Sequence, residues 1–88
     1  MLFIVIEQFK DTRAIGERFR TRGRMLPESV AYLDSWIDPA RSRCFQLMEA
    51  PSAGHLNPWI AAWKDLADFE VIPVQTSKEF WSGATAQA

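Results

Sequence analysis

The order of the secondary-structure patterns along the chain limits its possible folds more than any other feature of this sequence. Two segments have apolar residues at helical spacing, one around Ile15 and Phe19 and one around Ile60 and Trp63. Four short runs resemble strands in composition or in their period of two, and these are residues 2–9, 29–38, 42–49 and 68–75. The strand–helix–strand–strand–helix–strand order predicts an α+β, ferredoxin-like βαββαβ fold, with a four-stranded antiparallel sheet and two helices on one face.

Proline and polar residues refine this prediction. Pro73 lacks the N–H group that a strand ladder needs, so the last strand is expected at an edge of the sheet. The first strand is apolar on both faces and is expected at the centre. The second helix has two possible starts, one capped by Ser52 and one capped by Asn57 with Pro58 at the first helical position. The sequence leaves both starts open.

The two middle runs are predicted to pair as a β-hairpin around a turn at residues 38–41. The predicted register pairs Asp38 with Ser42, Trp36 with Cys44, Asp34 with Gln46 and Tyr32 with Met48, which divides the hairpin into two faces. The more apolar of the two faces is assigned to the helices, and it holds Ala31, Leu33, Ile37, Phe45 and Leu47. The other face holds Tyr32, Asp34, Trp36, Cys44, Gln46 and Met48. Because a large aromatic patch is rarely left in water, we expect a second copy to cover it, forming a homodimeric α/β barrel around a lumen.

Composition and charge argue against several classes of protein. The 88 residues carry ten Lys and Arg against eleven Asp and Glu, so no global positive charge favours nucleic acid. One cysteine and one histidine form neither an intramolecular disulfide nor a typical zinc site, and a glycine-rich phosphate loop is missing. No metal or cofactor is expected. The first residues lack the pattern of a signal peptide or a membrane span, which predicts a reduced, cytoplasmic protein.

Residues 1–77 are expected to form a single ferredoxin-like domain, because the chain is too short for a second core. Residues 78–88 form a polar C-terminal tail with one apolar pair, Phe80 and Trp81. The tail is expected either to be disordered or to pack on the partner subunit. The sequence also leaves open a larger assembly of dimers.

Asp34 is the first candidate for a catalytic group, because a carboxylate inside an apolar lumen has a raised pKa and can transfer protons. Glu7 is a second candidate, although the sequence does not determine on which face of the sheet it lies. His55, expected near the barrel mouth, is a third. Each has a structural alternative. Asp34, for example, can pair with Gln46 across the hairpin or with an arginine of the partner subunit.

The expected ligand-binding residues share a face with Asp34, and they are Tyr32, Trp36, Gln46, Met48 and Cys44. Trp36 offers an aromatic wall for a flat substrate. Cys44 is more often a packing residue than a nucleophile. Five arginines from Arg13 to Arg24 offer a patch for phosphate or RNA, but a solvated helix face accounts for them more simply.

Five segments together resemble an uncharacterised family of short bacterial proteins, known only as a domain of unknown function. They are Phe-Ile-Val-Ile-Glu-Gln-Phe-Lys at 3–10, Arg-Gly-Arg-Met-Leu-Pro at 22–27, Tyr-Leu-Asp-Ser-Trp-Ile-Asp at 32–38, Arg-Cys-Phe-Gln-Leu-Met-Glu at 43–49 and Asp-Phe-Glu-Val-Ile-Pro-Val at 68–74. The resemblance covers residues 1–77. It implies a place in the dimeric α/β-barrel superfamily, and with it the fold and the homodimer.

The wider superfamily includes small monooxygenases, a muconolactone isomerase and dechlorinases, all of which use the barrel lumen. The family itself has no assigned reaction, so the resemblance implies the fold and the dimer and leaves the activity open. One alternative is a small cofactor-free enzyme, isomerase or monooxygenase-like, that acts on a small aromatic or enolisable molecule in the barrel lumen. The other alternative is a non-catalytic dimeric barrel that binds a metabolite or another protein. Because a shared fold does not transfer function, both alternatives stay open.

Overall fold

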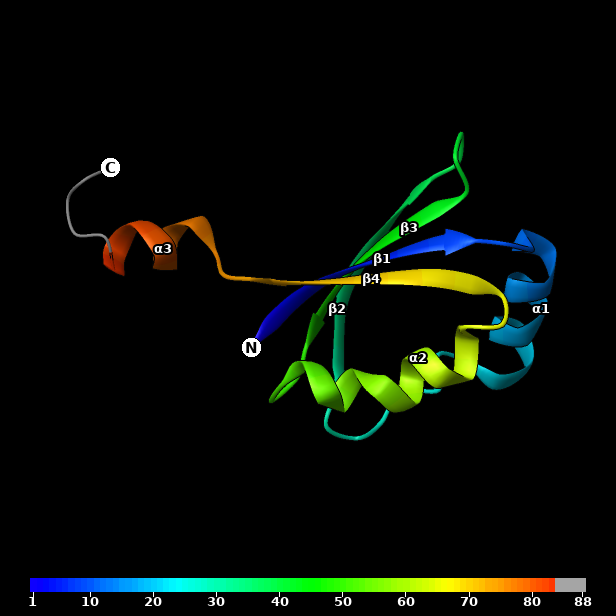
Figure 1. Ribbon diagram of the computed structural model, residues 1–88, viewed down its shortest axis with the longest axis horizontal. Helices are drawn as coiled ribbons and strands as arrows, with labels where there is room; N and C mark the ends of the chain where they lie inside the picture. The colour runs from blue at the N-terminus through cyan, green and yellow to red at the C-terminus, as the bar shows by residue number, and fades with distance from the viewer. Residues whose placement is uncertain (84–88) are drawn as a thin grey trace.

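The structure is a computed structural model that describes residues 1–83. Its elements, in chain order, are β1 (Leu2–Phe9), α1 (Thr12–Arg22), β2 (Ala31–Asp38), β3 (Arg43–Glu49), the 3-10 helix η1 (Ala53–Leu56), α2 (Asn57–Trp63), β4 (Ala67–Val74) and α3 (Ser77–Gly83). The α+β architecture with β-α-β-β-α-β order is therefore confirmed, and a further helix follows β4 (Figure 1).

The four strands form one antiparallel sheet in the order β2-β3-β1-β4. β1 pairs with β3 on one side and with β4 on the other, which fits its apolar composition on both faces. β4 lies at the edge, where the missing N–H of Pro73 can be tolerated. The predicted positions of these two strands are thus confirmed.

The register of the strands defines two faces of the sheet, because directly paired residues share a face. The rows beneath the helices are Ile37–Cys44–Glu7–Phe69, Ser35–Gln46–Val5–Val71 and Tyr32–Met48–Phe3–Pro73. The rows on the opposite side, here called the open face, are Trp36–Phe45–Ile6–Glu70 and Asp34–Leu47–Ile4–Ile72.

The predicted division of the hairpin between the two faces is wrong for β3 and for the start of β2, although Asp34 and Trp36 lie on the open face and Ile37 lies beneath the helices as predicted. Trp36 pairs with Phe45 instead of Cys44, and Asp38 pairs with Arg43 instead of Ser42. The connecting loop is therefore one residue longer than the predicted turn, and this change of register moves the β3 residues to the opposite face relative to Trp36 and Ile37.

A β-bulge between Tyr32 and Asp34 then returns Tyr32 to its predicted partner, Met48. On β3, the residues that were expected on the outer face, Cys44, Gln46 and Met48, lie beneath the helices. Phe45 and Leu47, which were expected beneath the helices, lie on the open face.

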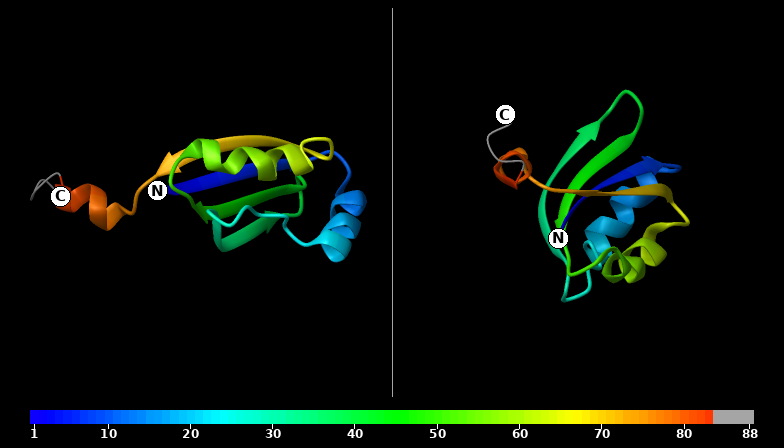
Figure 2. Two further views of the ribbon diagram at one scale, coloured as in Figure 1. Left: turned by 90° about the horizontal axis from the view of Figure 1, so that it is seen from below. Right: turned by 60° about the vertical axis from the view of Figure 1, so that its left-hand side comes forward.

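The core lies between the sheet and the helices α1 and α2, which cover the same face (Figure 2). Its buried members are Phe3, Val5, Val30, Met48, Ala50, Leu56, Trp59 and Trp63. Trp59 meets Phe69 edge-on, with 5.3 Å between ring centroids. Trp63, which the helical spacing places on one face with Ile60, is among these buried residues. Each large side chain buried here stabilises the fold by about 1.5–3 kcal/mol.

Local chemistry fixes the ends of the helices. Asp11 caps α1 by accepting a hydrogen bond from the Ala14 amide at 3.0 Å. Gly23 ends α1 with a φ of 66°, a conformation that favours glycine, and donates its N–H to the Phe19 carbonyl. The second helical segment begins near both predicted places, since Ser52 precedes η1 and α2 begins at Asn57, but neither of these side chains makes the predicted capping hydrogen bond.

Helix α3 extends away from the sheet and from the other helices, beyond the end of β4 (Figures 1 and 2). The radius of gyration is 14.7 Å, whereas a compact chain of this length has one of about 12 Å. Phe80 and Trp81 of α3 stack edge-to-face and stay half exposed. The rest of the predicted tail, residues 84–88, lies outside the described residues. Among residues 1–83, no helix has the length and apolar character needed to cross a membrane.

Candidate functional site

A cavity of about 290 Å³ lies between the helix-covered face of the sheet and the helices α1 and α2. Sheet side chains that line it are Glu7, Phe9, Ser35, Ile37, Cys44 and Gln46. Helix side chains that line it are Thr12, Ile15, Phe19, Trp59 and Trp63, with Gly16 between them. Arg24, from the loop between α1 and β2, completes the lining. The size and the aromatic walls suit one small, flat molecule.

Glu7 is the one carboxyl group in this lining. Strand alternation places it on the same face as Phe3 and Val5, so it is only 5% exposed. Burial raises the pKa of Glu7 from 4.5 to about 7, although the positive charge of Arg24 lowers it in part. Its Oε2 atom is buried without a hydrogen-bond partner among residues 1–83. A carboxyl group with this pKa can both donate and accept a proton near neutral pH.

Gln46 and Cys44 lie beside Glu7 on the neighbouring strand. The buried Oε1 atom of Gln46 also lacks a hydrogen-bond partner in the described part of the chain. Burial, and then the charge of Glu7, raise the pKa of Cys44 to about 12, so its thiol stays protonated and is a poor nucleophile. Buried oxygen atoms without partners are uncommon in folded proteins. Glu7 and Gln46, which both line the cavity, each bury one such oxygen atom.

Arg24 lies at the side of the cavity nearest to β2. Its guanidinium group stacks on the ring of Tyr32, 3.5 Å from the ring centroid, and lies 5.1 Å from that of Phe19. The Tyr32 hydroxyl is in turn 2.6 Å from the Ser35 hydroxyl. The bulge between Tyr32 and Asp34 brings residues 32 and 35 to the same face. Tyr32 therefore contacts two lining residues without lining the cavity itself.

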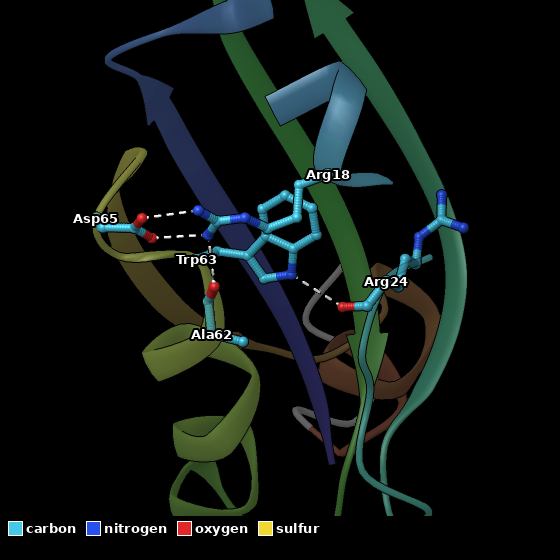
Figure 3. A network of polar contacts seen from close by, with 5 residues as sticks. All are labelled: Arg18, Arg24, Ala62, Trp63 and Asp65. Carbon is cyan, nitrogen blue, oxygen red and sulfur yellow. Dashed lines mark hydrogen bonds and ion pairs between the residues drawn. The ribbon is translucent and has the colours of Figure 1, made fainter. Parts of the chain in front are cut away.

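A polar network joins the elements around the cavity (Figure 3). Arg18 of α1 makes two hydrogen bonds of 2.8 Å to the carboxylate of Asp65 and one of 2.9 Å to the Ala62 carbonyl, at the end of α2. Trp63 donates its Nε1–H to the Arg24 carbonyl at 2.9 Å. Both helices and the loop are thereby held in a fixed relation around the cavity.

The structure brings only some of the predicted site residues together. Glu7, Gln46 and Cys44 line the cavity, and Tyr32 contacts it through Arg24 and Ser35. Met48 is completely buried in the core. The expectation that all five ligand-binding residues share one face with Asp34 is therefore wrong, because the register turns Cys44, Gln46 and Met48 beneath the helices.

Asp34 and Trp36 lie on the open face, away from the cavity. Trp36 is 53% exposed, and the Asp34 carboxylate is exposed and accepts the Ser35 N–H at 2.8 Å. His55 is also exposed, with its Nδ1 atom 2.9 Å from the Ser52 hydroxyl, and is not part of the cavity lining.

Sequence reasoning missed Arg24 and most of the wall residues. Arg24 was assigned with its neighbours to a solvated helix face, but α1 ends at Arg22, and the next residues turn toward the sheet. The positive φ of Gly23 and the 59° φ of Met25 mark this turn. Gly23, which follows the apolar helical pattern, was the sequence signal for the end of this helix. It does not show where the side chain of Arg24 points.

Residues 1–83 contain no group of three His, Cys, Asp or Glu side chains placed to hold a metal ion. In comparison with known proteins, residues 1–87 match the family described as Domain of unknown function (DUF3303). The chain belongs to the DUF3303 family. This family confirms the predicted resemblance and carries no assigned activity. No curated protein and no solved structure matches the chain.

Proposed function

We propose that this DUF3303 protein binds one small aromatic or enolisable molecule in the cavity between sheet and helices and catalyses a proton transfer on it. The observation that carries the proposal is Glu7, a buried carboxyl group with a raised pKa and an unpartnered oxygen atom in an aromatic-walled cavity. Active sites are where proteins bury such groups, because a general base is most effective when its pKa lies near the working pH. The site belongs to one chain and not to a lumen between two.

The chemistry of an isomerisation balances with these residues alone. The ionised Glu7 takes a proton from a carbon next to a carbonyl group, and the electron pair of that C–H bond forms the enolate. The resulting carboxylic acid then returns the proton to the other end of the enolate. The side-chain amide of Gln46, which lies beside Glu7 in the cavity lining, can donate a hydrogen bond to the oxygen on which negative charge develops. The reaction needs no redox partner.

The alternative is a binding module without turnover. A raised pKa also arises when a carboxyl group is buried for structural reasons, in which case Glu7 only contributes a hydrogen-bond donor to a bound ligand. The cavity would then have a ligand but no reaction.

Deuterium exchange distinguishes the two functions. A panel of small aromatic ketones and keto acids is incubated with the protein in D2O, and loss of C–H signals is followed by proton NMR. We expect exchange by the wild-type protein, and ligand binding without exchange by Glu7→Gln. Asp34→Asn is the matched control, because it neutralises an exposed carboxylate on the open face and leaves the cavity intact.

Binding with no exchange by the wild-type protein would favour the binding module. Absence of any binding would contradict a ligand site in this cavity. Oxygen uptake by the same mixtures would indicate the monooxygenase-like reaction instead.

We also infer that a second copy of the chain covers the open face. Its central rows carry Ile4, Ile6, Phe45, Leu47, Ile72 and the half-exposed Trp36. Such contiguous apolar surface supports association, and a two-fold dimer can place the same patch on both sides. The projecting helix α3 supports the same inference. Its apolar side chains Phe80 and Trp81 are exposed, because the helix extends away from the rest of its own chain.

A further inference from the structure

Arg24 indicates the charge of the ligand, because among residues 1–83 it is the only cationic side chain that lines the cavity. Among residues 1–83, no carboxylate, Glu7 included, lies within ion-pair distance of its guanidinium group. By contrast, Arg18 and Arg43 are paired at 2.8 Å with Asp65 and Asp38. Arg24 is nevertheless half-buried, and the aromatic rings of Tyr32 and Phe19 lie against its guanidinium group.

The backbone holds Arg24 in place from both sides. Gly23 before it and Met25 after it have φ values of 66° and 59°. Met25 has a side chain, so this left-handed conformation is strained, and such strain is concentrated at functional sites. The carbonyl of Arg24 itself is held by Trp63, another lining residue. The side chain then extends from this fixed point toward β2 (Figure 3).

The guanidinium carbon of Arg24 lies over the Tyr32 ring and near the Phe19 ring, and no hydrogen bond to residues 1–83 uses the guanidinium N–H groups, so they can bind a ligand. Those N–H groups form a planar fork that matches a carboxylate, and the pairing is stronger where water is partly excluded. The flat aromatic walls of the cavity match a planar molecule. When Glu7 is protonated, the single cation balances a monoanion and would leave a phosphate dianion partly uncompensated.

We infer that the cavity selects a small planar carboxylate, whose anionic group pairs with Arg24 while its other end reaches Glu7 and Gln46. This inference rests on the proposed function of the cavity and names the class of molecule that enters it. The substrate or ligand is thus an aromatic or enolisable carboxylic acid in its ionised form. Arg24 determines its specificity and orientation.

Matched pairs of probes test this inference. Benzoate and benzamide have nearly the same shape and differ in charge, so their affinities are compared at pH 6 by chemical-shift titration of the 15N-labelled protein. We expect wild-type protein to bind benzoate about tenfold more tightly than benzamide, which is the size of effect that a charged hydrogen-bonded pair produces. Arg24→Gln is expected to abolish this preference while still binding benzamide.

Arg22→Gln is the control, because Arg22 is exposed, lies at the end of α1 and is not part of the cavity lining. It is expected to keep the full preference for benzoate. Arg24→Lys retains the charge without the planar fork and is expected to keep only part of the preference. The amide spectrum of each variant shows directly whether it is folded.

Equal binding of benzoate and benzamide by the wild-type protein would overturn the charge assignment and leave the cavity as a ligand site. A preference that survives in Arg24→Gln would overturn the role of Arg24 in the same way. If neither probe perturbs the amides of residues that line the cavity, the inference and the proposed function both fail.

Discussion

Glu7 is a carboxyl group on a central strand, between Cys44 on β3 and Phe69 on β4, and its ionisation is therefore coupled to the stability of the fold. In the unfolded chain the carboxyl group has an ordinary pKa, whereas in the folded chain burial raises it to about 7. The folded state consequently binds more protons than the unfolded state between these two values. The contribution of Glu7 to the free energy of unfolding is therefore largest below pH 4.5, and it falls as the pH rises toward 7.

Replacing Glu7 by Gln removes this dependence on pH. For the wild-type protein, we expect the contribution of Glu7 to the free energy of unfolding to fall by about 3 kcal/mol between the two pKa values, because each pKa unit is worth about 1.4 kcal/mol. Glu7→Gln should lack this fall. Urea denaturation at a series of pH values measures it, with Asp34→Asn as a control that keeps the wild-type slope. A wild-type slope in Glu7→Gln would show that another group is responsible.

Trp63 supports Arg24 through one hydrogen bond, and its removal is testable. Trp63→Phe keeps an aromatic ring in the core but leaves the part-buried Arg24 carbonyl without its donor. We expect the free energy of unfolding to fall by about 1–3 kcal/mol, and the preference for benzoate over benzamide to decrease. Thermal melts and the same titrations measure both effects. Trp81→Phe, on the exposed helix α3, should change neither if the effect is specific.

At the scale of elements, two glycines of the α1 region differ in importance. Gly16 lies within α1 and is not required by the fold, whereas Gly23 follows α1 and is required. Gly16 has no atom near the position of an added Cβ, so alanine fits and should improve helix stability by about 0.5–1 kcal/mol. Gly23 has a φ of 66°, where an alanine is strained, so Gly23→Ala should be destabilising by about 1 kcal/mol. Thermal denaturation of the two variants should move in opposite directions. A shift of the same sign for both would contradict the assigned end of α1.

The same elements show what could be predicted from the sequence. The six elements of the β-α-β-β-α-β order were recognisable because their periodicities differ, and Pro73 marked the edge strand. The face assignment within the hairpin failed because it depends on register. A loop one residue longer and a bulge at Leu33 cannot be read from an alternating pattern.

The candidate site was predicted only in part for the same reason. Glu7, Cys44 and Gln46 were named from their residue types, but they were combined with Asp34 and Trp36 from the opposite face. Arg24 could not be placed, because its direction depends on two unusual backbone angles beyond the end of α1.

At the scale of the whole molecule, the apolar open face and the projecting α3 are the features that one chain leaves uncovered. We expect native mass spectrometry to give twice the chain mass of 10.1 kDa. Leu47→Asp places a charge in the central row of the open face and should yield the single-chain mass. Ala61→Asp, on the exposed side of α2, should leave the dimer intact. A single-chain mass for the wild-type protein would contradict the dimer and leave the cavity within each chain unaffected.

We propose that the buried Glu7 carboxyl group exchanges its proton near neutral pH. A 13C NMR titration of the Glu7 side-chain carboxyl, assigned by comparison with Glu7→Gln, tests it most directly. The midpoint should lie near the value of about 7 that burial imposes. A midpoint at the ordinary value of 4.5 would show that water reaches the group, and the proposed acid–base role would then be contradicted.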